Sequence, residues 1–262
     1  MIALVDYGAG NLASVRKALS ALGAEVETPR APADLAGAQG IIVPGVGNFA
    51  ATGALTEDWR RAIRAAVDRG TSLLGICLGM QWLYEGSAEA PGQPGLGYFA
   101  GTCELLTAGS TQNLRIGSPQ GAQNLETDPT PSTFAEATAD RRSLGGGWLW
   151  VSDGVKRRFK IPHVGWNSLE MPRASAALAG VAQDAQVYFT HSYVAPVTAD
   201  TAAVTTYGIP FAAAVERGRI AGVQFHPEKS GDVGLRILRN WVEMVGTGKG
   251  VSSKSGVRSA KC

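Results

Sequence analysis

The sequence has little of what marks a secreted or membrane-spanning chain. Its longest stretch without a charged residue, 35–56, contains Pro44, Asn48 and five glycines, so it does not favour a spanning helix. The first six residues carry no basic side chain, and Asp6 interrupts their apolar run, unlike a signal peptide. We therefore expect a cytoplasmic protein whose chain begins directly in a strand.

Cysteine is scarce too. The three cysteines, Cys77, Cys103 and Cys262, are odd in number and widely spaced, which argues against a disulfide framework. There is no CxxC pair, and neither His163 nor His191 has a second ligand at the spacing of a metal site. The sequence therefore predicts no metal centre.

An excess of charge of one sign is also missing. Lys and Arg number 24 against 22 Asp and Glu, and a net charge of +2 gives no reason to expect a nucleic acid or an acidic partner. By contrast, 45% of the residues are hydrophobic and 34 are glycine, which allows a sizeable core and indicates many tight turns. Only the tail, 246–262, is basic without acids, and we expect it to be disordered.

Hydrophobic spacing in the first half alternates between strands and helices. Short apolar runs at 2–5, 40–43 and 72–76 are typical of buried strands. Helical spacing follows each of them in turn, at 12–22, 57–69 and 78–84. This alternation predicts a parallel sheet with helices on both faces.

The second half has a different pattern. The sequence predicts strands at 186–194, 202–207, 211–216 and 219–225, of which the last two are joined by the hairpin signal Arg217-Gly218. A final helix is predicted over 233–245. The whole pattern predicts an α/β fold of three layers, with a mixed, mostly parallel sheet and an added antiparallel portion.

One domain is expected over 1–245, interrupted by an insertion at about 107–157. The insertion is rich in Thr, Ser, Gly, Gln, Asn and Pro and has little periodicity, apart from one candidate short helix at 134–142. Such a composition cannot easily offset the entropy of ordering. We expect the insertion to be exposed and partly mobile.

The strongest chemical signal is the pentapeptide Gly75-Ile76-Cys77-Leu78-Gly79, in which a strand enters, a helix leaves and a cysteine lies at the bend. This is the nucleophile-elbow arrangement with sulfur in place of oxygen. The helix N-terminus favours the thiolate, and the N–H of Leu78 would point at an oxyanion. The alternative is a buried structural cysteine.

A second signal, His226-Pro227-Glu228, ends the last predicted strand. At the rim of a sheet the carboxylate can reach the imidazole and fix its tautomer, which gives the thiol a base and the base an orienting acceptor. The alternative is a surface turn. The third signal, 44–47, is a glycine-rich turn after a strand, where the Val46 N–H can serve as a second oxyanion donor. The alternative is an ordinary turn.

Three stretches together resemble the class I, triad-type glutamine amidotransferases. They are 75–81 (GICLGMQ), 188–193 (YFTHSY) and 224–230 (QFHPEKS). Three more, at 6–12, 44–47 and 162–167, narrow the resemblance to the glutaminase subunits of imidazole glycerol phosphate synthase, from histidine biosynthesis. The resemblance covers 1–106 and 160–245, and the insertion has no equivalent in the family pattern.

The resemblance implies a flavodoxin-like fold and a catalytic triad. Cys77 would be the nucleophile, His226 the general base and acid, and Glu228 the residue that orients it. Val46 and Leu78 would supply the oxyanion N–H groups. The glutamine pocket would include Gly45, Gly47, Gly79, Gln81, Thr190, His191, Ser192 and Tyr193.

The resemblance also implies a partner. In this family a (βα)8-barrel cyclase subunit receives the ammonia through an internal channel and makes imidazole glycerol phosphate and an aminoimidazole carboxamide ribotide. Asn11, Trp166 and Lys229 match positions near that interface. No metal or organic cofactor is implied, because the covalent route needs only a thiol, a base and oxyanion donors.

Other interpretations stay open from the sequence. The chain can be the glutaminase subunit of another triad-type amidotransferase, or a free-standing cysteine hydrolase of the same fold, which would turn over glutamine without a partner. It can also be a non-enzymatic regulatory subunit that kept the fold. The presence of Cys77, His226 and Glu228 together argues against this last interpretation.

Overall fold

The computed structural model describes residues 1–107, 148–150, 156–158 and 160–246. Within these ranges no helix is both long and apolar enough to cross a bilayer. The predicted helix at 134–142 and the tail at 247–262 lie outside the described residues, as does most of the predicted insertion.

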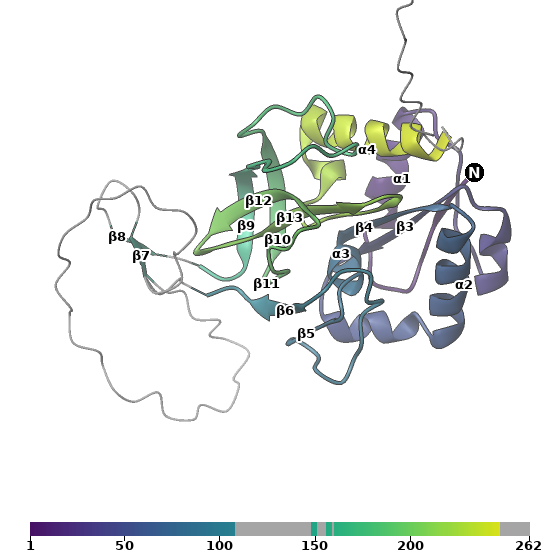
Figure 1. Ribbon diagram of the computed structural model, residues 1–262, viewed down its shortest axis with the longest axis horizontal. Coiled ribbons are helices and arrows are strands. Elements are labelled where there is room, and N and C mark those ends of the chain that lie inside the picture. Colours follow the sequence, from purple (N-terminus) through teal and green to yellow (C-terminus); the bar gives the residue numbers. More distant parts are fainter. Residues whose placement is uncertain (108–147, 151–155, 159, 247–262) are drawn as a thin grey trace, which may run out of the picture.

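A seven-stranded sheet forms the centre of the protein (Figure 1). Its strands pair in the order β12 (Thr201–Tyr207), β13 (Ile209–Arg217), β14 (Ile220–Val223), β4 (Ser72–Cys77), β3 (Gly40–Gly45), β1 (Ile2–Leu4) and β2 (Val26–Glu27). The five strands from β14 to β2 are parallel, and β12 and β13 are antiparallel. The parallel part has the flavodoxin strand order 2-1-3-4-5. The predicted fold class is therefore confirmed.

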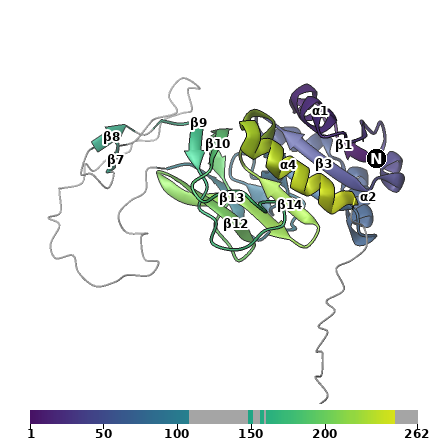
Figure 2. The same cartoon turned by 90° about the horizontal axis from the view of Figure 1, so that it is seen from above.

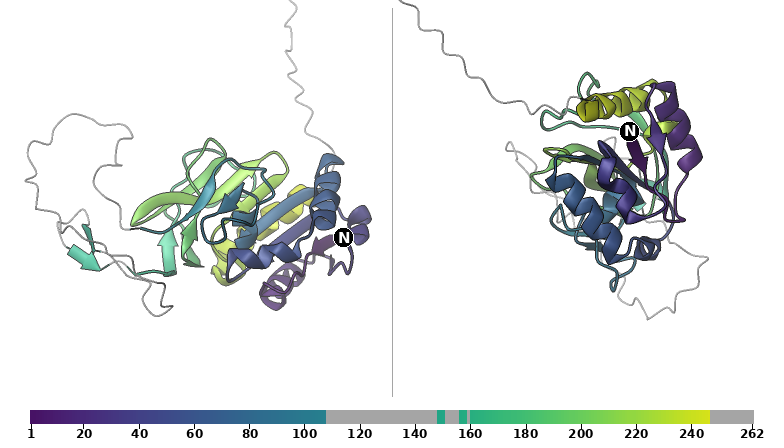
Figure 3. Two further views of the ribbon diagram at one scale, coloured as in Figure 1. Left: turned by 90° about the horizontal axis from the view of Figure 1, so that it is seen from below. Right: turned by 90° about the vertical axis from the view of Figure 1, so that its right-hand side faces the viewer.

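Helices cover both faces of this sheet, as its buried strands require (Figures 2 and 3). Helices α1 (Leu12–Ala21) and α4 (Gly231–Gly246) share one hydrophobic core, and α2 (Glu57–Asp68) and α3 (Leu78–Trp82) share the other. Two 3-10 helices, η1 (Pro32–Gly37) and η2 (Phe49–Ala54), belong to the second core. Each helix turns its apolar stripe toward the sheet.

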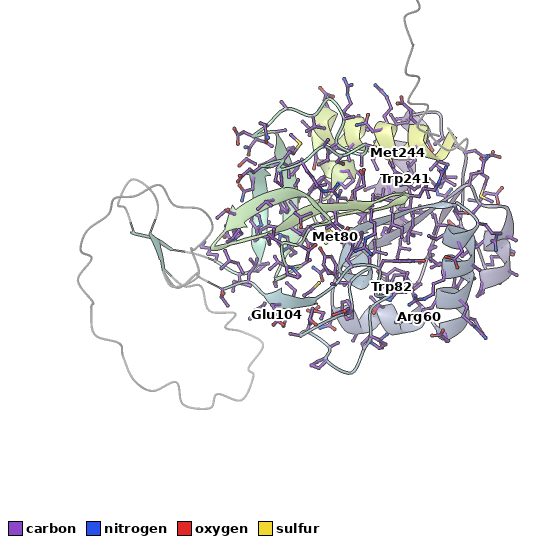
Figure 4. All side chains as sticks on the ribbon, viewed as in Figure 1. Arg60, Met80, Trp82, Glu104, Trp241 and Met244 are labelled. Atoms are coloured by element: carbon purple, nitrogen blue, oxygen red, sulfur yellow. The ribbon has the colours of Figure 1, made fainter. Side chains whose placement is uncertain are left out.

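Large aromatic side chains fill the two cores. Trp241 of α4 and Trp82 of α3 are fully buried on opposite sides of the sheet (Figure 4). The guanidinium of Arg60, from α2, lies over the Trp82 ring and donates to the carbonyl oxygens of Gly95 and Pro94 at 2.7 and 2.6 Å. These bonds fix the loop after α3 to the second core.

Several short strands pair outside the main sheet. Strand β9 (His163–Ser168) pairs antiparallel with β10 (Gln186–His191), and β6 (Thr102–Leu105) pairs with both β5 (Gly86–Ser87) and β11 (Tyr193–Val194). The single strand predicted at 186–194 is therefore wrong, because the chain breaks at Ser192 and continues in a different sheet.

The predicted insertion holds one regular feature among its described residues. Strand β7 (Trp148–Trp150) pairs antiparallel with β8 (Lys156–Arg158), whereas the composition predicted little regular structure there. Several other boundaries differ from the prediction by one or two residues; for example, α3 ends at Trp82 and β14 ends at Val223. The hairpin at Arg217-Gly218 is confirmed, and Gly218 has the positive φ of 59° that such a turn requires.

Close backbone approach fixes the bend between β4 and α3. A Cβ on Gly79 would lie 1.8 Å from the carbonyl oxygen of Val43, and one on Gly75 would lie 2.6 Å from the carbonyl oxygen of Gly79. Only glycine leaves room for α3 to pack directly against the ends of the strands. The two glycines therefore determine where Cys77, between them, is held.

We predict that Gly79→Ala lowers the free energy of unfolding by about 3 kcal/mol, because backbone must move to admit the methyl group. Gly92→Ala is the matched control, since a Cβ there meets nothing within 4 Å. Chemical denaturation of both variants provides the measurement. Equal midpoints for Gly79→Ala and the unaltered chain would contradict the assigned packing.

Candidate active site

Cys77 lies at a strained point of the backbone, where β4 ends and α3 begins. Its φ of 53° and ψ of −109° fall in a region that side-chain-bearing residues rarely adopt, at a cost of order 1–3 kcal/mol. The residue is 4% exposed, and its sulfur lies 3.9 Å from the carbonyl oxygen of Thr190. The bend holds the thiol at the carboxyl edge of the parallel strands, where open α/β sheets bind ligands.

His226 and Glu228 follow the neighbouring strand, β14. The Nδ1 atom of His226 lies 2.8 Å from Oε1 of Glu228, which sits in the 3-10 helix η4 (Pro227–Lys229), and both side chains are buried. The backbone N–H of His226 donates to the carbonyl oxygen of Tyr188 at 2.9 Å, which anchors η4 to β10. The Nε2 atom of His226 is buried and has no hydrogen-bond partner among the described residues.

The pKa of His226 is raised to about 9, although burial by itself lowers it. Interactions with Cys77 and with the carboxylate of Glu228 outweigh burial, because both favour the imidazolium. The folded-state pKa lies above the ordinary 6.5, so this charge adds to folding stability below pH 6.5. That contribution is lost as the pH rises through about 9. At neutral pH His226 is therefore a charged proton donor beside the sulfur.

The thiol borders a pocket of about 270 Å³. Six of the eight predicted pocket residues line it, namely Gly47, Gln81, Thr190, His191, Ser192 and Tyr193, together with Cys77, Leu78, Glu89 and Pro162. Glu89 is the only carboxylate in this lining, and it accepts a hydrogen bond from the Phe49 N–H at 2.7 Å. Burial raises the pKa of Glu89.

The other two predicted residues, Gly45 and Gly79, are not among the residues that line this pocket. Both are glycine because neighbouring atoms leave no room for a Cβ. One on Gly45 would lie 2.1 Å from Oη of Tyr7, and one on Gly79 would collide with the strand carbonyl described above. Their role in the structure is close packing behind the pocket.

The hydrogen bond of the Val46 N–H is the clearest difference from the prediction. It donates to the carbonyl oxygen of Ala9 at 3.0 Å, so in this conformation it is not free for an oxyanion. The following residue, Gly47, has a φ of 95°, which a β-branched residue could not adopt. Leu78, the other predicted donor, is the first residue of α3, where backbone N–H groups have no acceptor within the helix.

A chain of hydrogen bonds runs through two buried histidines behind the pocket. The Asn167 amide is oriented by two backbone groups, because its Oδ1 accepts from the Ser168 N–H and its Nδ2 donates to the Thr206 carbonyl. Its Nδ2 also lies 3.4 Å from Nε2 of His163. This atom of His163 is therefore an acceptor, and its proton lies on Nδ1.

The second histidine continues the chain. Nδ1 of His163 lies 3.1 Å from Nε2 of His191, and Nδ1 of His191 lies 3.0 Å from the carbonyl oxygen of Tyr193. Burial lowers the pKa of His163 to about 4, and burial followed by the neighbouring His163 lowers that of His191 to about 3. Both rings are neutral at physiological pH, with their protons on Nδ1.

Two of the three predicted partner-contact residues meet at one aromatic ring. Nζ of Lys229 lies 5.9 Å from the centroid of the Tyr188 ring, and Trp166 contacts the same ring edge-on at 6.1 Å. Trp166 is 55% exposed, and Val164, on the same face of β9, is 56% exposed. Asn11, the third, caps α1 by accepting from the Ser14 N–H at 3.3 Å.

Sequence reasoning missed three residues that the structure brings to the site. Glu89 and Pro162 line the pocket, and Nε2 of Gln224 lies 3.6 Å from the sulfur of Cys77. Glu89 lies in a loop with no periodic signal. Gln224 had one, because it stands two residues before His226 in the stretch 224–230 that carries the family resemblance. Among the described residues no three His, Cys, Asp or Glu side chains are grouped to hold a metal ion.

The three histidines give a direct test of these electrostatics. We predict that an NMR titration finds only His226 charged at pH 7, with a pKa near 9, because His163 and His191 titrate near 4 and 3. In Glu228→Gln the pKa of His226 falls toward 6.5, whereas Glu243→Gln, on the exposed side of α4, leaves it unchanged. An unaltered His226 pKa in Glu228→Gln would refute the pairing.

Most of the chain is similar to known sequences. The family model described as "Glutamine amidotransferase class-I" matches residues 3–245. Proteins named "Imidazole glycerol phosphate synthase subunit HisH" are similar over most of the chain. The one from Moorella thermoacetica is 36% identical, over 93% of this chain and 95% of its own. The one from Thermococcus kodakarensis is 37% identical, over 92% and 98%.

Solved structures support the fold. A crystal structure of a glutamine amidotransferase superposes with a TM-score of 0.58 at 20% identity, covering 94% of this chain and all of the other. The glutaminase domain of Trypanosoma brucei CTPS with bound acivicin superposes with a TM-score of 0.51 at 16% identity, covering 92% and 93%.

Proposed function

The chain belongs to the class-I glutamine amidotransferase family, and we propose that it is the glutaminase subunit of imidazole glycerol phosphate synthase. It hydrolyses glutamine to glutamate and passes ammonia to a cyclase subunit in histidine biosynthesis. The arrangement of His226 and Glu228 beside Cys77, which borders the pocket, carries this proposal. We place the protein in the cytoplasm, where such a thiol stays reduced.

Catalysis starts from the thiolate of Cys77 paired with the imidazolium of His226. The thiolate attacks the side-chain carbonyl carbon of glutamine, and the carbonyl oxygen becomes an oxyanion beside the Leu78 N–H. When this adduct collapses, Nε2–H of His226 protonates the leaving nitrogen, and ammonia departs from a glutamyl thioester. Glu228 holds the ring in the required orientation through Nδ1.

In the second half of the cycle, His226 changes from a proton donor to a proton acceptor. Neutral His226 takes a proton from water, and the hydroxide adds to the thioester carbonyl. The new adduct expels the thiolate, which restores the starting ion pair and releases glutamate. Apart from the reactants, glutamine and water, the cycle uses only groups of the chain itself. We therefore expect no cofactor.

The pocket suits free glutamine. Glu89 presents a carboxylate in the pocket lining and can pair with the α-ammonium group. Among the residues that the structure describes, no lysine or arginine lines the pocket, and we expect the α-carboxylate to bind backbone N–H groups and hydroxyls. The volume is below the roughly 300–1,000 Å³ of drug-sized sites, as expected for a small amino acid.

The proposed partner is a (βα)8-barrel cyclase subunit. The exposed Trp166 ring, which contacts Tyr188 beside Lys229, supports a docking surface there, because aromatic residues are enriched at interfaces. Lys229 lies next to Glu228 in sequence, so contact with a partner can reach the triad directly.

We predict that Cys77→Ala abolishes glutamine-dependent synthesis by the complex, while synthesis with added ammonium salt continues. This chain would make the ammonia, whereas the partner would use it. Cys262→Ala is the matched control and should retain both activities. Steady-state assays of the assembled complex with each nitrogen source provide the measurement, and glutamine-dependent turnover in Cys77→Ala would remove Cys77 from the mechanism.

The 45–46 peptide gives the partner a means of activation. In the conformation described, the Val46 N–H is bonded to Ala9, and turning the peptide would aim it at the oxyanion instead. Loss of one oxyanion donor typically costs about 10²–10³ in rate. A partner that stabilises the turned peptide would restore that factor.

We therefore predict that the isolated chain is a poor glutaminase, and that the cyclase with its bound ribonucleotide stimulates it about 100-fold or more. Lys229→Ala should lose this stimulation while Cys77 remains open to alkylation. Arg30→Ala, at an exposed position after the edge strand β2, should keep it. Glutamine hydrolysis is measured for the chain alone, for the chain with the cyclase, and for the chain with the cyclase and the ribonucleotide. Equal rates in all three would rule out the switch.

A further inference from the structure

Gln224 occupies a place beside the nucleophile that the catalytic scheme above does not use. It follows β14 and precedes His226 by two residues. Both side chains interact with Cys77, whereas Phe225 between them is buried in the core. The Gln224 side chain is fully buried, and its Nε2 lies 3.6 Å from the cysteine sulfur.

The orientation of this amide is fixed by the protein. Nε2 of Gln81 donates to Oε1 of Gln224 at 3.0 Å and also to the carbonyl oxygen of Tyr193 at 2.9 Å. Because Gln81 occupies the oxygen, the nitrogen of Gln224 must face the sulfur. The backbone is held as well, since the Gln224 N–H donates to the Ala213 carbonyl at 2.8 Å.

We propose that Gln224 is a further catalytic residue, which donates an amide N–H to the Cys77 sulfur and stabilises the thiolate. This inference rests on the proposed function of the site. A hydrogen bond to a charged acceptor is stronger than one to a neutral acceptor, so the contact favours the thiolate over the thiol. Gln224 has no titratable proton and therefore moves none, and proton transfer remains with His226.

The bond acts twice in each turnover. It stabilises the thiolate before attack and again when the thiolate leaves the thioester, whereas the thioester sulfur between these steps is a weaker acceptor. Stabilising a thiolate also lowers its intrinsic nucleophilicity, but by less than the gain in thiolate fraction. Below the alkylation midpoint, the net effect is a faster reaction with electrophiles.

The test is the pH dependence of Cys77 alkylation by iodoacetamide in the full chain, followed by mass spectrometry of the Cys77 peptide. Gln224→Glu keeps an acceptor for Gln81 but replaces the N–H donor by a carboxylate. Gln224→Met removes the donor without adding charge. Gln183→Glu is the matched control, because it makes the same chemical change at an exposed amide that bonds only to the backbone of Met171.

We expect the alkylation midpoint to rise by about one pH unit in Gln224→Met and by more in Gln224→Glu, with Gln183→Glu unchanged. One unit is a tenfold change in the equilibrium constant between thiol and thiolate, or about 1.4 kcal/mol. A midpoint that stays unchanged in either folded Gln224 variant would overturn the role of Gln224 alone. An unaltered chain whose Cys77 does not react would instead overturn the proposed function.

Discussion

The site depends on one backbone constraint, the bend that carries Cys77 from β4 into α3. The residue is held at a φ of 53°, and the strain persists because the surrounding contacts leave the chain no alternative path. Gly75 and Gly79 allow those contacts, since any Cβ at either position would overlap a backbone atom. The same packing brings the thiol level with the end of β14, from which His226 and Gln224 reach it.

The three histidines illustrate how much the environment decides. All three are buried, and burial alone favours the neutral ring in each case. His226 is nevertheless charged at neutral pH, because a carboxylate and the cysteine face it. The hydrogen-bond partners of His163 and His191 are each other, an amide and a carbonyl, and both rings stay neutral. One imidazole is thus charged and can transfer protons, whereas the other two are neutral hydrogen-bonding groups, of which His191 also lines the pocket.

Much of this could be predicted from local sequence. The apolar runs predicted the buried strands, because such strands need a continuous hydrophobic stretch, and the glycines flanking Cys77 predicted the bend. The resemblance supplied the fold topology. What failed depends on distant partners. The break at Ser192 arises because β10 and β11 pair with strands from different parts of the chain. The direction of the Val46 N–H is set by Ala9, and the contact of Gln224 with the sulfur is set by Gln81.

The shared register of β3, β4 and β14 has a consequence for how such a chain can change in length. Gly45 pairs with Cys77 and Val223 with Ile76, so the site residues leave three strands at matched heights. Because side chains alternate along a strand, one inserted or deleted residue in any of these strands would turn its functional groups to the opposite face. Gain and loss of residues over evolutionary time is therefore confined to connections that do not set this register. The connection between β6 and β9, residues 106–162, is the longest of these.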